Sequence, residues 1–359
     1  MTPRTALVAE QLHRPVPGGI GTYIRGLVRG LISVGGGGDV TLVASPVLRG
    51  DDPVAEQGLA VHRVPLPSRV LVQAWGMGLC GIPRRFDVVH APSLAVPACS
   101  AVPVVVTVHD LAWRRVPGAF PARGRKWHEA ALGRAIRKAA AFVVPSEATA
   151  EDLLAAGARP DRVRVIEEGI DHLRPPDHEA GGQLLARLQV DGPFVLAVGT
   201  IEPRKNLPRL LEAWTRASSR LGPEWRLVVA GPSGWGPGAV AAAHTVLAGK
   251  VDDAVLTHLY GAARVVAYVP LTEGFGLPAV EAMACGTPVV ASPMPSTAGA
   301  ALEVDPLSVC SIAEGLVAAA TDTELRDRLS ARAAVRASQL SWGDAARRHA
   351  RLWAEVSGR

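Results

Sequence analysis

The chain has 359 residues, of which 48% are hydrophobic and 20% charged. This composition argues against disorder, and the length exceeds what one hydrophobic core usually serves, so two domains are expected. Its four cysteines include no C-x-x-C pair, which argues against a disulfide framework or structural zinc site and favours a reducing compartment. No apolar run resembles a signal peptide or reaches the length of a bilayer. We therefore expect a cytoplasmic protein.

The net charge of +5 favours anionic partners, either phosphates or acidic lipids, although an ordinary basic surface accounts for it equally well. Arginines concentrate in residues 114–138, where Trp113 and Trp127 are interleaved with basic side chains. This segment would suit a membrane interface and would place the protein peripherally on the inner face of the cytoplasmic membrane. Nucleic-acid binding is not expected, because no recognised module accompanies the charge.

Along the chain, short apolar runs alternate with helical stretches, as in parallel sheets covered by helices. The fold class predicted is therefore α/β. In the first half the runs that indicate buried strands are TALVAE (5–10), DVTLVAS (39–45), DVVHAP (87–92), VPVVVTVHD (102–110), AFVVPSE (141–147) and VRVIEEGID (163–171). In the second half they are PFVLAVGT (193–200), RLVVAGPSG (226–234), HTVLAGKV (244–251), ARVVAYVP (263–270), TPVVASP (287–293) and AALEVD (300–305).

The segment between the two series is rich in proline, glycine and charge, and it indicates a linker at 173–184. We expect one Rossmann-like domain at 1–172, a second at 185–340, and an amphipathic helix at 341–359. In sheets of this kind, ligands bind at the carboxyl ends of the strands. The residues that follow each predicted strand are therefore the candidates for function.

The most informative of these segments is EGFGLPAVEAMACGTPVV, residues 273–290, which places Glu273 and Glu281 on either side of a glycine-rich turn. Pro278 suits the first position of a helix and Gly286 its C-terminal cap. The backbone N–H groups before that helix can converge with its dipole on an anion, and the two carboxylates can accept hydrogen bonds from hydroxyl groups. A sugar attached to a nucleoside diphosphate fits both features. The alternative is a loop, a structural helix and a buried strand, with Glu281 solvated.

Two further glycine-containing segments follow predicted strands. In VGTIEPRKN (198–206), Arg204 and Lys205 could hold a diphosphate and stabilise the charge that develops on a departing β-phosphate, unless the segment is a solvated loop. In PVPGGIGTYIRGLVRGL (15–31), three glycines allow the backbone to approach a ligand closely. That segment partly imitates a dinucleotide loop but lacks the G-x-G-x-x-G spacing. A nicotinamide-dependent oxidoreductase nevertheless remains an alternative.

The run 273–290 resembles the signature of the family-four glycosyltransferases, in which two glutamates separated by seven residues bind the donor. The spacing of Glu273 and Glu281 fits, as do the intervening GFGLP and the following EAMACGTPVV. The resemblance implies a GT-B fold: two Rossmann-like domains facing a cleft, the first binding the acceptor and the second the nucleotide-sugar donor. The C-terminal helix would cross back to pack on the first domain.

The resemblance also implies a role for each candidate residue. Glu273 would contact donor-sugar hydroxyls, Glu281 the ribose, and His109, at the end of an apolar strand, the donor sugar. A structural role for His109 is the alternative, and His90 occupies a similar strand end with weaker support. The implied catalytic residues are His109, Glu273, Arg204 and Lys205. The implied donor-binding residues are Gly18, Gly19, Gly21, Gly199, Gly231, Gly274, Phe275, Gly276, Leu277 and Glu281.

No Asp-x-Asp sequence occurs, so we expect no metal and no cofactor besides the nucleotide-sugar substrate. The resemblance implies a retaining transfer of a hexose to a glycan or lipid-linked acceptor. GTIEPRKN together with TEGFGLP is most similar to bacterial mannosyltransferases of surface polysaccharide or glycolipid assembly, which favours GDP-mannose. A noncatalytic binding protein derived from a transferase is an alternative. The family pattern is broken at Thr200, at Glu168 and in the shortened segment 293–306.

Overall fold

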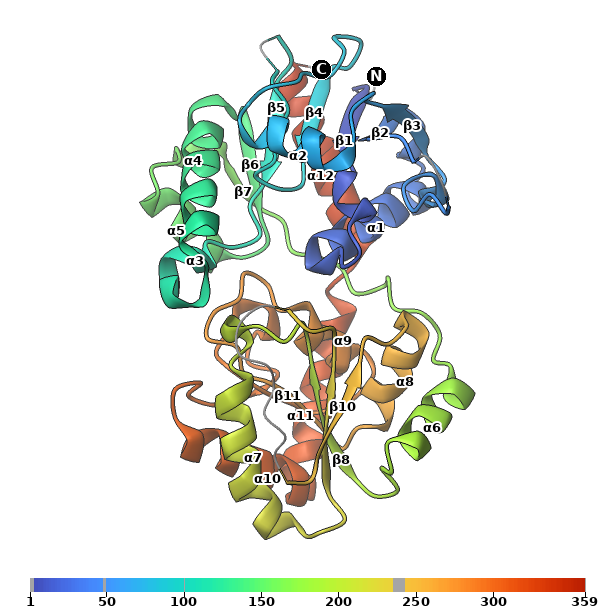
Figure 1. The fold of residues 1–359 in the computed structure, drawn as a ribbon, viewed down its shortest axis with the longest axis vertical. Coiled ribbons are helices and arrows are strands. Elements are labelled where there is room, and N and C mark those ends of the chain that lie inside the picture. The colour runs from blue at the N-terminus through green and yellow to red at the C-terminus, as the bar shows by residue number, and fades with distance from the viewer. Residues whose placement is uncertain (1–2, 48–49, 100, 235–242, 359) are drawn as a thin grey trace. The chain divides into compact units, whose positions relative to one another are not determined.

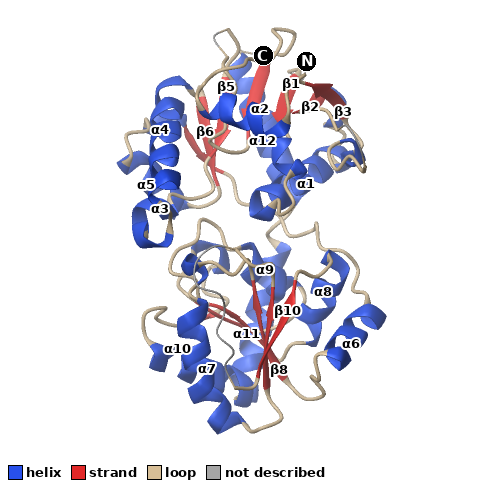
Figure 2. Ribbon diagram, viewed as in Figure 1, coloured by secondary structure: helices blue, strands red, loops and turns tan. Residues whose placement is uncertain are grey.

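The computed structural model describes residues 3–47, 50–99, 101–234 and 243–358, and the chain divides into two compact units. Unit 1 comprises Met1–His172 and Ser341–Arg359, and unit 2 comprises Leu173–Leu340 (Figure 1). Each unit contains one sheet in which all described strand pairs are parallel, with helices on its faces (Figure 2). The predicted α/β class is confirmed.

The sheet of unit 1 has seven strands in the order β3-β2-β1-β4-β5-β6-β7. Their bounds are β1 Thr5–Val8, β2 Val40–Ala44, β3 Ala60–Arg63, β4 Val88–Ala91, β5 Val104–Thr107, β6 Ala141–Val144 and β7 Val163–Val165. The helices are α1 Gly18–Ser33, α2 Ser68–Gly76, α3 Ala112–Arg115, α4 Ala122–Lys138, α5 Glu147–Ala155 and α12 Trp342–Ser357. Short 3₁₀ turns are η1 Glu10–His13, η2 Gly37–Asp39, η3 Ala55–Gln57, η4 Pro117–Ala119 and η5 Pro160–Arg162.

Both faces of this sheet are buried, which explains why its strands are continuous apolar runs. Along β1, Ala6 and Val8 join a core with α2, α4 and α5, whereas Leu7 joins a second core with α1 and α12. Successive side chains of a strand point to opposite faces, so each short run supplies two cores.

The sheet of unit 2 has six strands in the order β10-β9-β8-β11-β12-β13. Their bounds are β8 Phe194–Val198, β9 Arg226–Ala230, β10 Thr245–Gly249, β11 Val265–Tyr268, β12 Val289–Ala291 and β13 Leu302–Glu303. The helices are α6 His178–Arg187, α7 Leu207–Leu221, α8 Asp253–Ala262, α9 Leu277–Ala284, α10 Val309–Thr321 and α11 Thr323–Ser338, with η6 Pro203–Lys205 and η7 Pro295–Thr297. Helices α7 and α10 share a core with strands β8, β9, β11 and β12.

Each sheet reverses its strand order once, between β1 and β4 in unit 1 and between β8 and β11 in unit 2. In open parallel sheets the connections leaving such a pair diverge and leave a ligand site at the strand ends. The segment before α1 follows β1, whereas Arg204 and Lys205 follow β8 and the run beginning at Glu273 follows β11. The predicted site segments of unit 2 therefore come from neighbouring strands at its switch point.

Helix α12 packs on α1 within unit 1, and glycines make the close approach possible. A Cβ at Gly26 would lie 2.1 Å from the Trp342 ring, and one at Gly30 would lie 2.2 Å from the Trp342 carbonyl oxygen. Gly169 approaches the Trp342 backbone nitrogen equally closely, at 2.1 Å from its would-be Cβ. The last helix of the chain thus belongs to the first unit.

Two local expectations differ from the structure. The segment 173–184 is not wholly a linker, because α6 begins at His178 within it. The Asp177 side chain caps this helix by accepting a hydrogen bond from the Ala180 backbone N–H (2.9 Å). This N-cap favours a helix despite the neighbouring glycines. The glycines at 18, 19 and 21 form the first turn of α1, so they are not a loop. From Tyr23 onward the helix has a buried apolar face with helical periodicity, and the helix extends from there back to Gly18.

The tryptophans expected at a membrane interface also separate. Trp113 is buried, stacks on His128 and donates a hydrogen bond from its indole nitrogen to Glu129 (2.7 Å), so it is a core residue. Trp127 on α4 is 36% exposed. None of the helices in the described part of the chain combines the length and apolarity needed to cross a membrane.

Candidate functional site

Two glycines shape the ends of the neighbouring strands β8 and β9 in unit 2. Gly199 follows β8 with φ +143°, and Gly231 follows β9 with φ +151°. A Cβ on Gly231 would lie 2.0 Å from the Gly199 carbonyl oxygen, so a side chain there would collide with the neighbouring backbone. Because glycine at both positions has no Cβ and tolerates a positive φ, the connections leaving β8 and β9 can turn side by side. The local backbone geometry thus explains why both predicted positions are glycine.

A compact ion cluster connects the two donor motifs. Glu273 is paired with the guanidinium of Arg204 through one oxygen, Oε1. Its other oxygen, Oε2, lies 3.0 Å from Lys205 Nζ and accepts a hydrogen bond from the Tyr268 hydroxyl at 2.6 Å. Arg204 also pairs with Glu202 at 2.8 Å. Two positive and two negative side chains therefore balance in this cluster, and the three catalytic candidates of this unit lie in direct contact.

The second glutamate of the motif is held separately. Glu281 lies on α9, is 8% exposed and accepts a hydrogen bond from the hydroxyl of Tyr260 on α8 (2.8 Å). Burial, with the negative charge of Glu281 beside it, raises the pKa of Tyr260 well above its ordinary value, so that hydroxyl stays a donor. Burial also raises the pKa of the Cys285 thiol to about 11. The solvated Glu281 of the structural alternative is not what is found.

The turn between the two glutamates is tightly packed. Gly276 has φ +97° and precedes α9, and a Cβ on it would lie 2.5 Å from Met294 Sδ. Phe275 and Leu277 are buried on either side of it. Helix α9 begins at Leu277, so Pro278 lies in its first turn, and Gly286 follows the helix with φ +78°, as the sequence predicts.

In unit 1, His109 follows β5 and its ring is fixed on three sides. Its Nε2 lies 3.1 Å from the Pro92 carbonyl oxygen, its Nδ1 lies 3.3 Å from Glu168 Oε1, and Tyr23 meets the ring edge-on at 4.9 Å. A carbonyl oxygen only accepts, so Nε2 carries a proton. Glu168, 4% exposed, therefore explains one departure from the family pattern: it is the partner of a candidate site residue. Asp110 caps the next turn by accepting from the Ala112 N–H (3.0 Å).

His90 does not share that position, because it belongs to a fully buried chain of hydrogen bonds. His90 Nε2 lies 2.7 Å from Thr107 Oγ1, which lies 2.9 Å from the Tyr23 hydroxyl, which in turn lies 2.7 Å from Nε2 of His349 on α12. Burial lowers the pKa of His90 well below its ordinary value. The structural interpretation therefore holds for His90.

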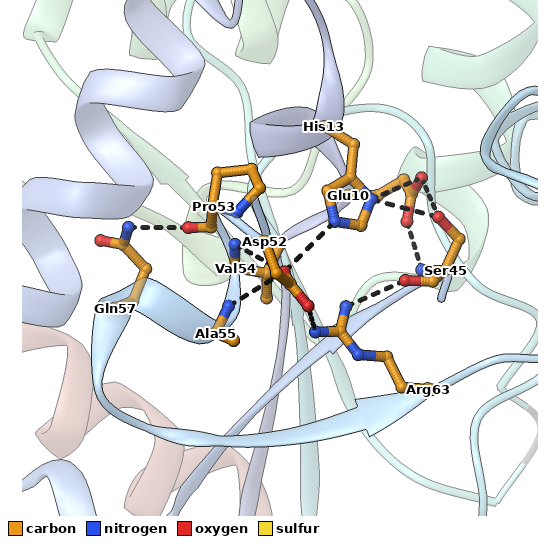
Figure 3. A network of polar contacts seen from close by, with 9 residues as sticks. All are labelled: Glu10, His13, Ser45, Asp52, Pro53, Val54, Ala55, Gln57 and Arg63. Atoms are coloured by element: carbon orange, nitrogen blue, oxygen red, sulfur yellow. Dashed lines mark hydrogen bonds and ion pairs between the residues drawn. The ribbon is translucent and has the colours of Figure 1, made fainter. Parts of the chain in front are cut away.

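Another polar network lies where the strands β1, β2 and β3 end (Figure 3). Glu10 accepts hydrogen bonds from the Ser45 backbone N–H (2.6 Å) and hydroxyl (2.8 Å), and His13 lies 3.1 Å from that hydroxyl. Arg63 pairs with Asp52 and donates to the Ser45 carbonyl oxygen (2.9 Å). Burial alone would raise the pKa of Asp52, but the Ala55 backbone N–H and the Arg63 charge lower it. The network fixes the segment between β1 and α1.

Sequence reasoning missed the tyrosines. The chain has three, Tyr23, Tyr260 and Tyr268, and each contacts one of the candidate residues His109, Glu281 and Glu273. A signal was available for Tyr268, which lies within a predicted strand, five residues before Glu273. Within the described ranges, no three His, Cys, Asp or Glu side chains are grouped to hold a metal ion.

Comparison with known families covers both units. Residues 17–174 match the model described as Glycosyltransferase Family 4, and residues 186–336 match Glycosyl transferases group 1. The D-inositol 3-phosphate glycosyltransferase of Xylanimonas cellulosilytica is 33% identical over 294 residues, which cover 72% of this chain and 67% of the relative. O-antigen chain mannosyltransferase B of Escherichia coli is 35% identical over 161 residues, 42% of each chain. Matches to further D-inositol 3-phosphate glycosyltransferases span 42–49% of those proteins' own length.

Solved structures agree on the fold. Anabaena HepE in complex with UDP and glucose superposes with a TM-score of 0.72 at 17% identity, covering 98% of this chain and 100% of that one. WaaG, a glycosyltransferase of lipopolysaccharide biosynthesis, superposes with a TM-score of 0.70 at 18% identity, covering 97% and 99%. The GT-B fold implied by the sequence is therefore confirmed. The chain belongs to the family 4 and group 1 glycosyltransferases.

Proposed function

We propose that the protein transfers a hexose, with mannose as the preferred sugar, from a nucleotide-sugar to a hydroxyl group of a glycan or lipid-linked acceptor. The observation that carries the proposal is the cluster of Arg204, Lys205 and Glu273 at the switch point of unit 2, because it joins two phosphate-binding cations to a hydroxyl-binding carboxylate. Mannose is supported by the motif form and by one relative, the O-antigen chain mannosyltransferase. Anabaena HepE, crystallised with UDP-glucose, supports a nucleotide-sugar donor.

In this proposal the diphosphate of the donor replaces Glu273 as the partner of the two cations. Arg204 supplies two parallel donors to phosphate oxygens and Lys205 supplies a compact charge. As the bond to the sugar breaks, negative charge grows on the β-phosphate, and both cations stabilise it. Glu273, released from them, accepts hydrogen bonds from the sugar hydroxyls, and Glu281 accepts from the ribose.

The reaction proceeds with retention of configuration, and the departing phosphate takes the proton of the incoming hydroxyl on the same face of the sugar. His109 contacts the donor sugar, with its ring fixed by Glu168 and Pro92. The protein then orients the reactants and stabilises charge, and it needs neither a covalent glycosyl-enzyme nor a metal ion. These assignments include the glycines at 18, 19, 21, 199 and 231 as close neighbours of the donor.

We further propose that a lipid-linked acceptor is met at a membrane surface through α4. Trp127 is exposed there, and the helix carries the exposed bases Arg123, Arg137 and Lys138. Such a surface attracts anionic headgroups, and the protein would then be cytoplasmic and peripherally bound. The relatives named D-inositol 3-phosphate glycosyltransferases add a soluble polyol phosphate to the acceptors worth assaying.

A thermal-shift screen against GDP-, UDP-, dTDP- and ADP-sugars, with NAD as the control ligand, tests the donor class. Selective binding to the folded state raises the unfolding temperature by mass action. We expect a rise with one nucleotide-sugar, GDP-mannose first, and none with NAD. The rise should disappear in Glu281→Ala and persist in Glu324→Ala, whose carboxylate side chain is 90% exposed on α11. A shift with NAD alone would reject the proposal.

A further inference from the structure

Tyr268 is a residue of the candidate site that lies outside the sequence motifs from which the site was predicted. It is the last residue of β11, is 3% exposed, and its ring touches both donor motifs. Lys205 Nζ lies 5.0 Å from the centre of the ring, and a Cβ on Gly276 would lie 3.5 Å from ring atom Cε1. One side chain therefore spans the segments that follow β8 and β11.

The direction of each hydrogen bond at this phenol follows from the chemistry of its partners. A lysine ammonium only donates, so the Tyr268 oxygen accepts from Lys205 Nζ at 2.7 Å. The phenol has one proton, which it donates to Glu273 Oε2 at 2.6 Å. Lys205 reaches the same carboxylate oxygen directly at 3.0 Å. Tyr268 is thus both an acceptor for the cation and a donor to the anion.

This arrangement matters when a phosphate arrives. In the structure, Oε2 accepts from both Lys205 and Tyr268 while Oε1 is held by Arg204. If Lys205 turns towards a phosphate, the phenol still donates a hydrogen bond to Glu273, and its oxygen still accepts from the ammonium. The carboxylate then keeps a partner at a position where its side chain is only 10% exposed and where losing every donor would be costly.

We propose that Tyr268 is a positioning residue that lets Lys205 exchange Glu273 for the β-phosphate of the donor while both side chains stay in place. The inference rests on the proposed function, since it takes a nucleoside diphosphate as the ligand. Without the hydroxyl, Lys205 and Glu273 form only the direct ion pair, which competes with the phosphate for the lysine. The loss should fall on ligands that carry a β-phosphate.

The test compares the binding of GDP and GMP, and of UDP and UMP, to the full chain by calorimetry. Tyr268→Phe keeps the ring and removes the hydroxyl, and it should lower diphosphate affinity about tenfold, as expected for one lost hydrogen bond to a charged group. Monophosphate affinity should change less than about twofold. Tyr260→Phe is the matched variant, because the Tyr260 hydroxyl donates to Glu281 and not to Glu273. This variant should lower the affinity for the diphosphate and the monophosphate by the same factor and leave the ratio of the two affinities unchanged.

Thermal unfolding checks that each variant folds, and the same substitution in a Glu273→Gln background gives a second measurement. There the competing charge is gone, so Tyr268→Phe should leave the diphosphate-to-monophosphate ratio unchanged. A Tyr268→Phe protein that loses affinity for both ligands equally, or for neither, overturns the inference alone. A wild-type protein that binds no nucleoside diphosphate overturns the inference and the proposed function together.

Discussion

At the scale of single residues, the candidate site consists of charged groups each held by a neutral donor or acceptor. The charged members are visible in the sequence because motif spacing identifies Glu273, Glu281 and Lys205. Their neutral partners are not, because Tyr260 and Tyr268 reach them from other elements of the fold. Glu168 was noticed only as a departure from the family pattern, and the contact with His109 gives the departure a reason.

Lys205 provides the sharpest prediction at this scale. Lys205→Ala should lower turnover about 10²-fold, since charge on the departing phosphate grows towards the transition state, and it should also weaken donor binding. Steady-state kinetics with the donor found in the screen measures both quantities. Arg328→Ala removes an exposed cation of unit 2, on α11, and should leave both unchanged. Intact turnover in Lys205→Ala would remove this lysine from the reaction.

At the scale of elements, the strands were predictable because they are buried on both faces and therefore read as short apolar runs. The helical segments that were not predicted begin with residues that are common in loops as well as at helix starts. Helix α6 starts inside a segment of glycine, proline and charge, where a capping aspartate decides the outcome. The glycines of α1 suggested a loop, because glycine favours no backbone conformation strongly and only the stripe that follows indicates a helix.

The docking of α12 on α1 leads to a prediction about pH. His349 donates from Nδ1 to the Ala345 carbonyl oxygen (2.7 Å), so Nε2 must accept from the Tyr23 hydroxyl, which requires a neutral ring. Burial lowers the pKa of His349 from 6.5 to about 4. Between these values the unfolded chain binds the proton and the folded chain does not. The contribution of His349 to stability is therefore full above pH 6.5, and it falls by ~3 kcal/mol as the pH drops towards 4.

Urea unfolding at pH 7.5 and pH 5, followed by tryptophan fluorescence, measures this loss. His349→Gln keeps an acceptor for Tyr23 but cannot take up the proton, so its stability should depend less on pH. Buried His90 contributes in the same direction and remains in the variant. Equal pH dependence in the two proteins would show that α12 docking is not linked to His349.

At the scale of the whole molecule, two successive strand series predicted two α/β units, and each unit contains one parallel sheet. The prediction that the last helix packs on the first unit rested only on the family resemblance, because no local pattern in 341–359 indicates which unit the helix contacts. The three close approaches of glycine to Trp342 are its physical basis. The cluster of Arg204, Lys205 and Glu273 suits any hexose on a nucleoside diphosphate, and mannose is proposed from the motif form and one relative.

If this cluster catalyses transfer from a nucleotide-sugar, the reaction releases a nucleoside diphosphate, which can be assayed in solution. The purified chain is incubated with GDP-mannose and the other nucleotide-sugars, alone and with polysaccharide, glycolipid and D-inositol 3-phosphate acceptors. We predict that the protein releases diphosphate from one donor and that one acceptor accelerates this release. The Glu273→Ala variant should lose both the release and its acceleration. If the folded protein releases no diphosphate from any donor with any acceptor class, the cluster does not catalyse this transfer.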